Sequence, residues 1–190
     1  MLHLPFRTLL ATALLGVSAL SVNAQTLLMT VDVSDPSHVV FSSTQANPEN
    51  LVIETSTALG VSLVNFFTSY LEVEVSFPVS GDLFPNGATV SFDAFSTLEG
   101  EFNLYNWANT SYIDFLTDSP AFTGEGLVFD LSSWAAYLPT SGHTGTIHVG
   151  YDETGLLLGS YQVIPEPTSV ALMVGVGLIG FGLHLRRRSA

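Results

Sequence analysis

Apolar and polar residues alternate along much of the chain between residues 25 and 164. Successive side chains of a β-strand point to opposite faces, so this spacing predicts strands with one buried face. We predict such strands at residues 27–34, 71–77, 89–94, 102–104, 127–131 and 147–151, and shorter ones at 39–42, 51–55 and 157–163. In residues 71–77 the pattern predicts that Val73, Val75 and Phe77 are buried, with Glu72 and Glu74 facing solvent.

Turn-forming residues separate these segments. They include Asp35-Pro36, Pro85-Asn86-Gly87, Glu99-Gly100 and Ser141-Gly142. Many short strands with such punctuation are typical of an antiparallel β-sandwich or jelly roll, so we predict an all-β body at residues 25–164. Two exceptions are expected, a short helix within residues 59–71 and a helical turn at 133–137.

The first 24 residues have the pattern of a secretory signal peptide. Arg7 supplies the charged region, an apolar run follows, and small residues precede a predicted cleavage by signal peptidase between Ala24 and Gln25. We therefore expect this segment to be absent from the folded protein.

The C-terminal segment, residues 165–190, has three consecutive features. It begins with Pro165, Glu166 and Pro167, continues with an apolar run at residues 168–185 and then has a basic cluster, Arg186, Arg187 and Arg188. Eighteen helical residues extend about 27 Å, close to the thickness of a bilayer core, so we predict a transmembrane helix there. The arginines belong on the cytoplasmic side, which places the body outside the cytoplasm.

These features resemble the PEP-CTERM sorting signal. The resemblance implies recognition by an exosortase, a membrane-embedded cysteine transpeptidase of Gram-negative bacteria, and processing near residues 165–167. The protein would then be anchored in the inner membrane only transiently, before delivery to the cell surface or the extracellular polysaccharide matrix. The alternative is an ordinary C-terminal anchor that is never cut.

The charge of the body narrows its possible partners. Sixteen of the 17 acidic residues and none of the four Lys and Arg residues lie within residues 25–164, which gives this stretch a formal charge of −16. Nucleic acid is therefore not an expected partner. The absence of cysteine also excludes thiol catalysis and thiolate metal sites.

No resident cofactor is expected, but unopposed acids raise the hypothesis of a Ca²⁺ site. Asp32 and Asp35 bracket one turn, and Asp152 and Glu153 lie together in another. Glu99 and Glu101 also flank Gly100, although none of these pairs has the spacing of an EF-hand. Loop acids are more often solvated turn formers.

Aromatic residues near position 107 suggest a second kind of site. Tyr105, Trp107 and Tyr112 are interleaved with asparagines, a composition that suits stacking on sugar rings and hydrogen bonding to hydroxyls. Ordinary strand packing would give the same alternation.

The catalytic alternative rests on Glu72 and Glu74. Their spacing on one strand face, about 7 Å, falls in the range of an inverting glycosidase, but such acids usually flank a cleft from different elements. We therefore predict a structural or polysaccharide-binding surface protein and not an enzyme. A carbohydrate-active enzyme and a permanently anchored surface protein without a ligand are the alternatives.

Overall fold

A computed structural model describes residues 25–56, 59–98, 100–108 and 112–165. The described residues form twelve strands and one 3₁₀ helix: β1 (Leu27–Asp32), β2 (Val39–Ser43), β3 (Val52–Ser56), β4 (Val61–Leu63), β5 (Val75–Ser76), β6 (Ser80–Pro85), β7 (Ala94–Leu98), β8 (Glu101–Tyr105), β9 (Tyr112–Phe115), β10 (Phe122–Phe129), η1 (Ser132–Tyr137), β11 (Thr144–Val149) and β12 (Leu157–Ile164). The predicted signal peptide, Glu166, Pro167, the apolar run and the arginine cluster lie outside the described residues.

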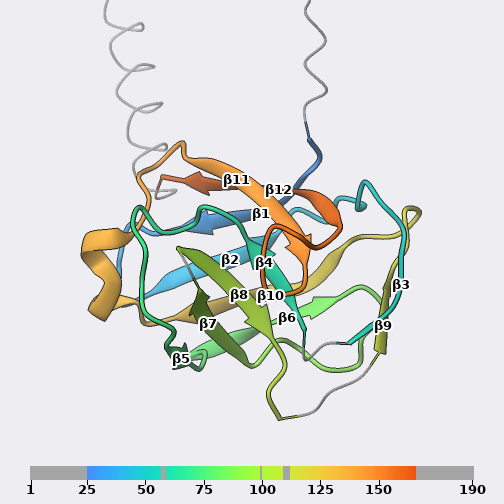
Figure 1. Cartoon of the computed structure of the whole chain (residues 1–190), viewed down its shortest axis with the longest axis horizontal. Coiled ribbons are helices and arrows are strands. Elements are labelled where there is room, and N and C mark those ends of the chain that lie inside the picture. The colour runs from blue at the N-terminus through green and yellow to red at the C-terminus, as the bar shows by residue number, and fades with distance from the viewer. Residues whose placement is uncertain (1–24, 57–58, 99, 109–111, 166–190) are drawn as a thin grey trace, which may run out of the picture.

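In the described part of the chain, ten strands form one sheet in the order β5-β7-β8-β4-β11-β12-β1-β2-β10-β6, and β3 pairs with β9 in a small second sheet. The edge strands β5 and β6 are separated by only three residues along the chain. Four Cα steps extend at most about 14 Å, so the sheet must curl until its two edges approach one another. The result is the curled half-barrel seen in Figure 1.

The prediction of an all-β body is confirmed, but its antiparallel sandwich topology is wrong. The main sheet is mixed, because β1 and β12 pair in parallel, with Asp32 opposite Ile164. This pairing brings the first and last strands of the body together in the middle of the sheet (Figure 1). One curled sheet encloses the core, where a sandwich would use two packed sheets.

Aromatic side chains fill the inside of the curl. The Phe102 ring stacks on Phe95 and Phe41 at centroid distances of 4.3 and 4.5 Å, and Phe129 meets it edge-on at 5.5 Å. These four rings come from β2, β7, β8 and β10, which are distant in the sequence. Trp134 of η1 adds an edge-on contact to Phe95, in line with the helical turn predicted at residues 133–137.

The helix predicted within residues 59–71 is wrong. Val61 and Leu63 instead form β4, paired on one side with β8 and on the other with β11. Gly60 precedes this strand at φ +65°, and a Cβ there would lie 1.8 Å from the Leu104 carbonyl oxygen. The close approach of two backbones at Gly60 favours strand pairing over the helix that the apolar spacing suggested.

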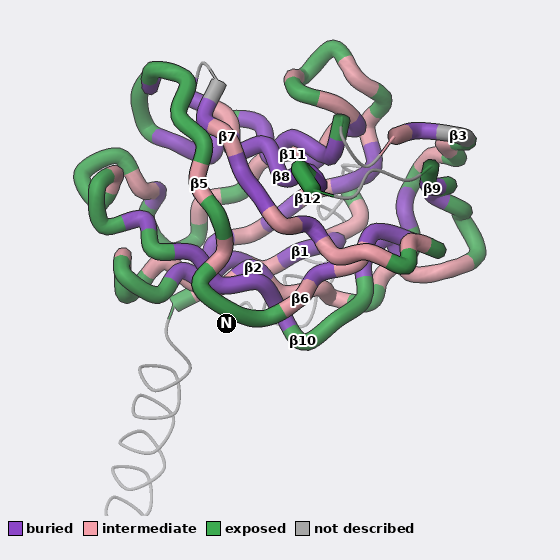
Figure 2. Tube along the Cα trace, turned by 90° about the horizontal axis from the view of Figure 1, so that it is seen from below, coloured by how far each residue is buried: buried purple, intermediate pink, exposed green. Residues whose placement is uncertain are grey.

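The burial predicted for residues 71–77 is also wrong. Leu71 is buried, but Val73, Val75 and Phe77 are 61%, 45% and 56% exposed. Only Val75 and Ser76 pair, with β7, because this segment forms one edge of the sheet (Figure 2). Alternation predicted one buried face for the segment, but beyond Leu71 both faces are largely exposed.

The aromatic core predicts a large cost for truncating its central ring. Phe102→Ala should lower the free energy of unfolding of the 25–164 body by about 3–5 kcal/mol, measured by urea denaturation. The matched control Phe77→Ala should change it by no more than about 0.5 kcal/mol, because that ring is 56% exposed. Equal effects of the two substitutions would contradict the core described here.

Candidate functional site

The candidate site is built on the outer face of β8. Phe102 and Leu104 point into the core, so Glu101, Asn103 and Tyr105 lie on the opposite face, about 7 Å apart in succession. Trp107 follows two residues beyond the strand. Asn103 and Tyr105 are nevertheless only 0% and 7% exposed, because other parts of the chain cover this face.

The cover is the loop at residues 150–156, between β11 and β12. Asn103 Nδ2 donates to the Gly150 carbonyl oxygen at 2.8 Å. Ser62 of β4 donates through Oγ to Glu101 Oε2 at 2.5 Å and also lies 3.3 Å from the Tyr151 carbonyl oxygen. These partly buried hydrogen bonds fix the loop over the sheet and hold its side chains beside those of β8.

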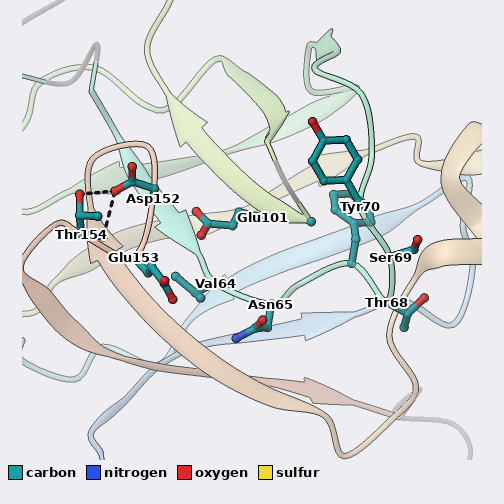
Figure 3. Close-up of a pocket in the computed structure, with 11 residues that line it drawn as sticks. Val64, Asn65, Thr68, Ser69, Tyr70, Glu101, Asp152, Glu153 and Thr154 are labelled. Atoms are coloured by element: carbon teal, nitrogen blue, oxygen red, sulfur yellow. Dashed lines mark hydrogen bonds between the residues drawn. The ribbon is translucent and has the colours of Figure 1, made fainter.

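Next to this loop is a cavity of about 460 Å³ that is rich in polar groups. Glu101, Asp152 and Glu153 contribute carboxylates, and the opposite side is formed by residues 67–70, including Tyr70. Figure 3 shows Glu101 on β8 beside Asp152 and Glu153 of the loop, with Thr68, Ser69 and Tyr70 on the other side of this space. Such a set of acceptors suits hydrogen bonds from sugar hydroxyls or amines.

Glu101 and Asp152 differ in protonation behaviour. Burial raises the pKa of Glu101, the Ser62 hydrogen bond opposes that effect, and the negative charge of Asp152 raises the pKa again. Asp152 is instead held by Thr154, which donates through Oγ1 at 2.5 Å and through its backbone N–H at 2.9 Å. These hydrogen bonds lower the pKa of Asp152 and keep it ionised.

At the other end of β8, aromatic side chains reach the surface. The Trp107 side chain is 63% exposed, and its ring centroid lies 6.2 Å from that of Tyr105. The backbone N–H groups of Trp107 and Ala108 donate to Asp93 Oδ1 and Oδ2 at 2.5 and 3.1 Å. Asp93 therefore fixes the chain that presents the exposed indole.

Tyr151 of the covering loop completes this region, which we call the aromatic face: Tyr105, Trp107 and Tyr151. Tyr151 is 45% exposed. Burial raises the pKa of Tyr105, and the nearby Tyr151 and Asp93 raise it further. The Tyr105 hydroxyl is therefore neutral at physiological pH and able to donate a hydrogen bond.

The structure brings together only part of the predicted sugar site. Tyr105 and Trp107 are neighbours, whereas Tyr112 lies on β9 in the small sheet and is 79% exposed. Sequence reasoning missed Asp93 and Tyr151 and treated Glu101 only as a loop acid. The alternation of residues 101–105 was the signal that would have placed Glu101 on the same face of the strand as Tyr105.

The acids of the Ca²⁺ hypothesis lie in two separate places. Asp32 pairs with Ile164 at the end of β12, whereas Asp152 and Glu153 lie in the loop before β12 begins. Both Asp32 and Asp35 accept hydrogen bonds from the serine two residues ahead. Among the described residues, no three His, Cys, Asp or Glu side chains are grouped to hold a metal ion.

The remaining predicted residues stand apart from the cavity. Glu72 and Glu74 are both exposed on the edge segment before β5. Gln25 and Pro165 are exposed just outside β1 and β12. Within the described ranges, no helix has the length and apolar character needed to span a membrane.

The raised pKa of Glu101 predicts a pH-dependent stability. Relative to the unfolded chain, folding favours the protonated acid, so this stability is present below the ordinary pKa of 4.5 and is lost as pH rises through the higher folded value. Glu101→Gln keeps an acceptor for Ser62 and should raise Tm more at pH 7 than at pH 4. Glu125→Gln, at an exposed position, should not; a pH-independent effect of Glu101→Gln would contradict the assignment.

Comparison with known proteins matches one segment of the chain. No curated protein and no solved structure matches the chain. Residues 163–188 match the model of the PEP-CTERM protein-sorting motif, which begins within β12 and confirms the resemblance drawn from the sequence. The chain therefore carries a C-terminal PEP-CTERM sorting motif, the mark of an exported protein that an exosortase processes and sorts to the cell surface.

Proposed function

We propose that this is a surface or matrix protein whose body binds extracellular polysaccharide through the aromatic face. The observation that carries the proposal is the Trp107 side chain, 63% exposed on a backbone that Asp93 holds in place. A large aromatic ring presented to water on a fixed support suits stacking against the apolar face of a sugar. The Tyr105 ring packs behind the indole, and Tyr151, 45% exposed, adds a second aromatic ring to the same face.

The charge of the body defines the class of polysaccharide. Residues 25–164 contain no Lys or Arg and carry a formal charge of −16. A polymer of uronic acids would be repelled, and its carboxylates would find no cationic side chain to pair with. The proposed ligand is therefore a neutral polysaccharide or one that contains amino sugars, with carboxylates such as Glu101 accepting from its hydroxyl or ammonium groups.

The role we propose is binding, without catalysis. Glu72 and Glu74, the pair considered for glycoside hydrolysis, are both exposed on a single edge segment. A glycosidase needs one carboxyl group on each side of the scissile bond, and two neighbouring acids on one exposed segment do not enclose a sugar in that way.

The polysaccharide proposal predicts the effect of removing the indole. Trp107→Ala should weaken binding to a neutral glucan or to chitosan by at least about tenfold, while Tm stays unchanged because the side chain is mostly exposed. Co-sedimentation of the processed body, with Ca²⁺ and with chelator, measures this. Tyr137→Ala, on η1, is the matched control and should bind normally.

Two results would contradict the proposal. One is equal binding by wild type and Trp107→Ala. The other is a preference for alginate, a uronic acid polymer, in the presence of chelator. Binding that requires Ca²⁺ would support the cation hypothesis for the acidic loops.

The sorting motif predicts a separate outcome. Pro165→Ala combined with Glu166→Ala should leave an uncut, membrane-bound precursor, seen as a larger species in the membrane fraction on an immunoblot. Thr144→Ala, at an exposed position on β11, should be processed normally. Normal processing of the motif variant would favour a permanently anchored protein.

A further inference from the structure

The directions of four neighbouring strands, β12, β1, β2 and β10, define one rim of the sheet. β1 and β12 are parallel, and β2 is antiparallel to both β1 and β10, so β1, β10 and β12 all end on the same side. We call this the exit rim: Asp32, Asp35, Asp130, Ser141 and Ile164. Backbone hydrogen bonds fix the loops of this rim: Leu131 N–H donates to the Pro36 carbonyl, beside Asp35 and Asp130, and Gly142 N–H donates to the Val163 carbonyl, beside Ser141 and Ile164.

The end of β12 is held firmly at this rim. β12 pairs with β1 on one side and with β11 on the other, and the Val163 N–H donates to the His143 carbonyl oxygen at 2.8 Å. Leu158, Tyr161 and Val163 are all within the core. Peeling β12 away would therefore expose core side chains as well as break sheet hydrogen bonds, so Ile164 is the fixed end of the folded body.

Only residues 165–167 separate Ile164 from the apolar run that begins at Thr168. Whatever their conformation, the four Cα steps from Ile164 to Thr168 span at most about 14 Å. We propose that in the membrane-anchored precursor the exit rim faces the bilayer surface. The proposal rests on the transmembrane role of the apolar run within the sorting function above, but not on polysaccharide binding.

The exit rim is poorly suited to remain on an anionic membrane. Asp35 and Asp130 are fully exposed, and their pKa values are lowered by hydrogen bonds from Ser37 and Ser132, so both carry a negative charge. A tether of at most about 14 Å keeps the exit rim within about two Debye lengths of the membrane surface, since the Debye length is about 8 Å at physiological ionic strength. At that separation, anionic lipids still repel these carboxylates. Once the tether is cut, this repulsion favours departure of the body from the membrane.

The same strand directions place the aromatic face away from the membrane. β8 is antiparallel to β4, β4 to β11 and β11 to β12, so β8 runs opposite to β12. Trp107, beyond the end of β8, is thus near the rim where β12 begins. In Figure 1 the end of β8 and the end of β12 lie on different sides of the body. The precursor would already present its aromatic face to the exterior.

The orientation can be measured directly because the chain contains no cysteine. Ser141→Cys places a fluorophore on the exit rim, and Thr117→Cys places one near the opposite rim, where the Asn47 amide donates to the Thr117 carbonyl. Both positions are exposed. The precursor without its signal peptide, residues 25–190, is reconstituted in vesicles of phosphatidylethanolamine and phosphatidylglycerol that contain a headgroup nitroxide lipid. Quenching should be several-fold stronger at Ser141 than at Thr117.

A spacer tests whether the short tether is the cause. Twelve Gly and Ser residues inserted between Ile164 and Pro165 have a typical end-to-end distance of about 20 Å, so the difference in quenching should largely disappear. Equal quenching at the two positions without the spacer, stronger quenching at Thr117, or a difference that persists with the spacer would each overturn the proposal. A chain that the vesicles do not retain would overturn the membrane span itself, independently of any polysaccharide result.

Discussion

The stacked rings of Phe41, Phe102 and Phe95 are the interaction on which the remaining structure depends. Their centroids lie 4.5 and 4.3 Å apart, and they join strands from both halves of the curled sheet. Because Phe102 occupies the inner face of β8, its neighbours Glu101 and Asn103 must occupy the outer face. The candidate site is therefore positioned by the core directly beneath it, and the rigidity of that core is transmitted to the exposed aromatic and acidic side chains.

An acidic body without Lys or Arg must satisfy its carboxylates without those ion-pair partners. It does so with hydroxyl and backbone N–H donors close by in sequence. Asp35, Asp130 and Asp152 each accept bonds from the Ser or Thr two residues ahead, and these bonds lower their pKa values. Their stabilisation is present above the ordinary pKa of 3.8 and is lost as pH falls below it. The same local turns end strands and fix the loop that covers β8.

The position of β12 connects folding to sorting. The strand that leads into the PEP-CTERM motif lies in the middle of the sheet, paired on both sides. Processing beyond Ile164 would leave every strand of the described body intact, whereas a cut within β12 would remove core residues such as Tyr161. Because the motif follows a central strand, cleavage within the motif beyond Ile164 would leave the body folded after its release.

Sequence alone determined the features that depend on local chemistry. Alternation predicted β8 and β12, turn residues predicted the loop at 152–155, and the order of Pro-Glu-Pro, apolar run and arginines identified the sorting motif. Tertiary structure decided the rest, because it depends on contacts between distant segments. Residues 71–77 alternate like a half-buried strand yet lie at a sheet edge, and the parallel pairing of β1 with β12 leaves no local signal. Asp93 joins the candidate site only because the pairing of β7 with β8 brings it beside Trp107.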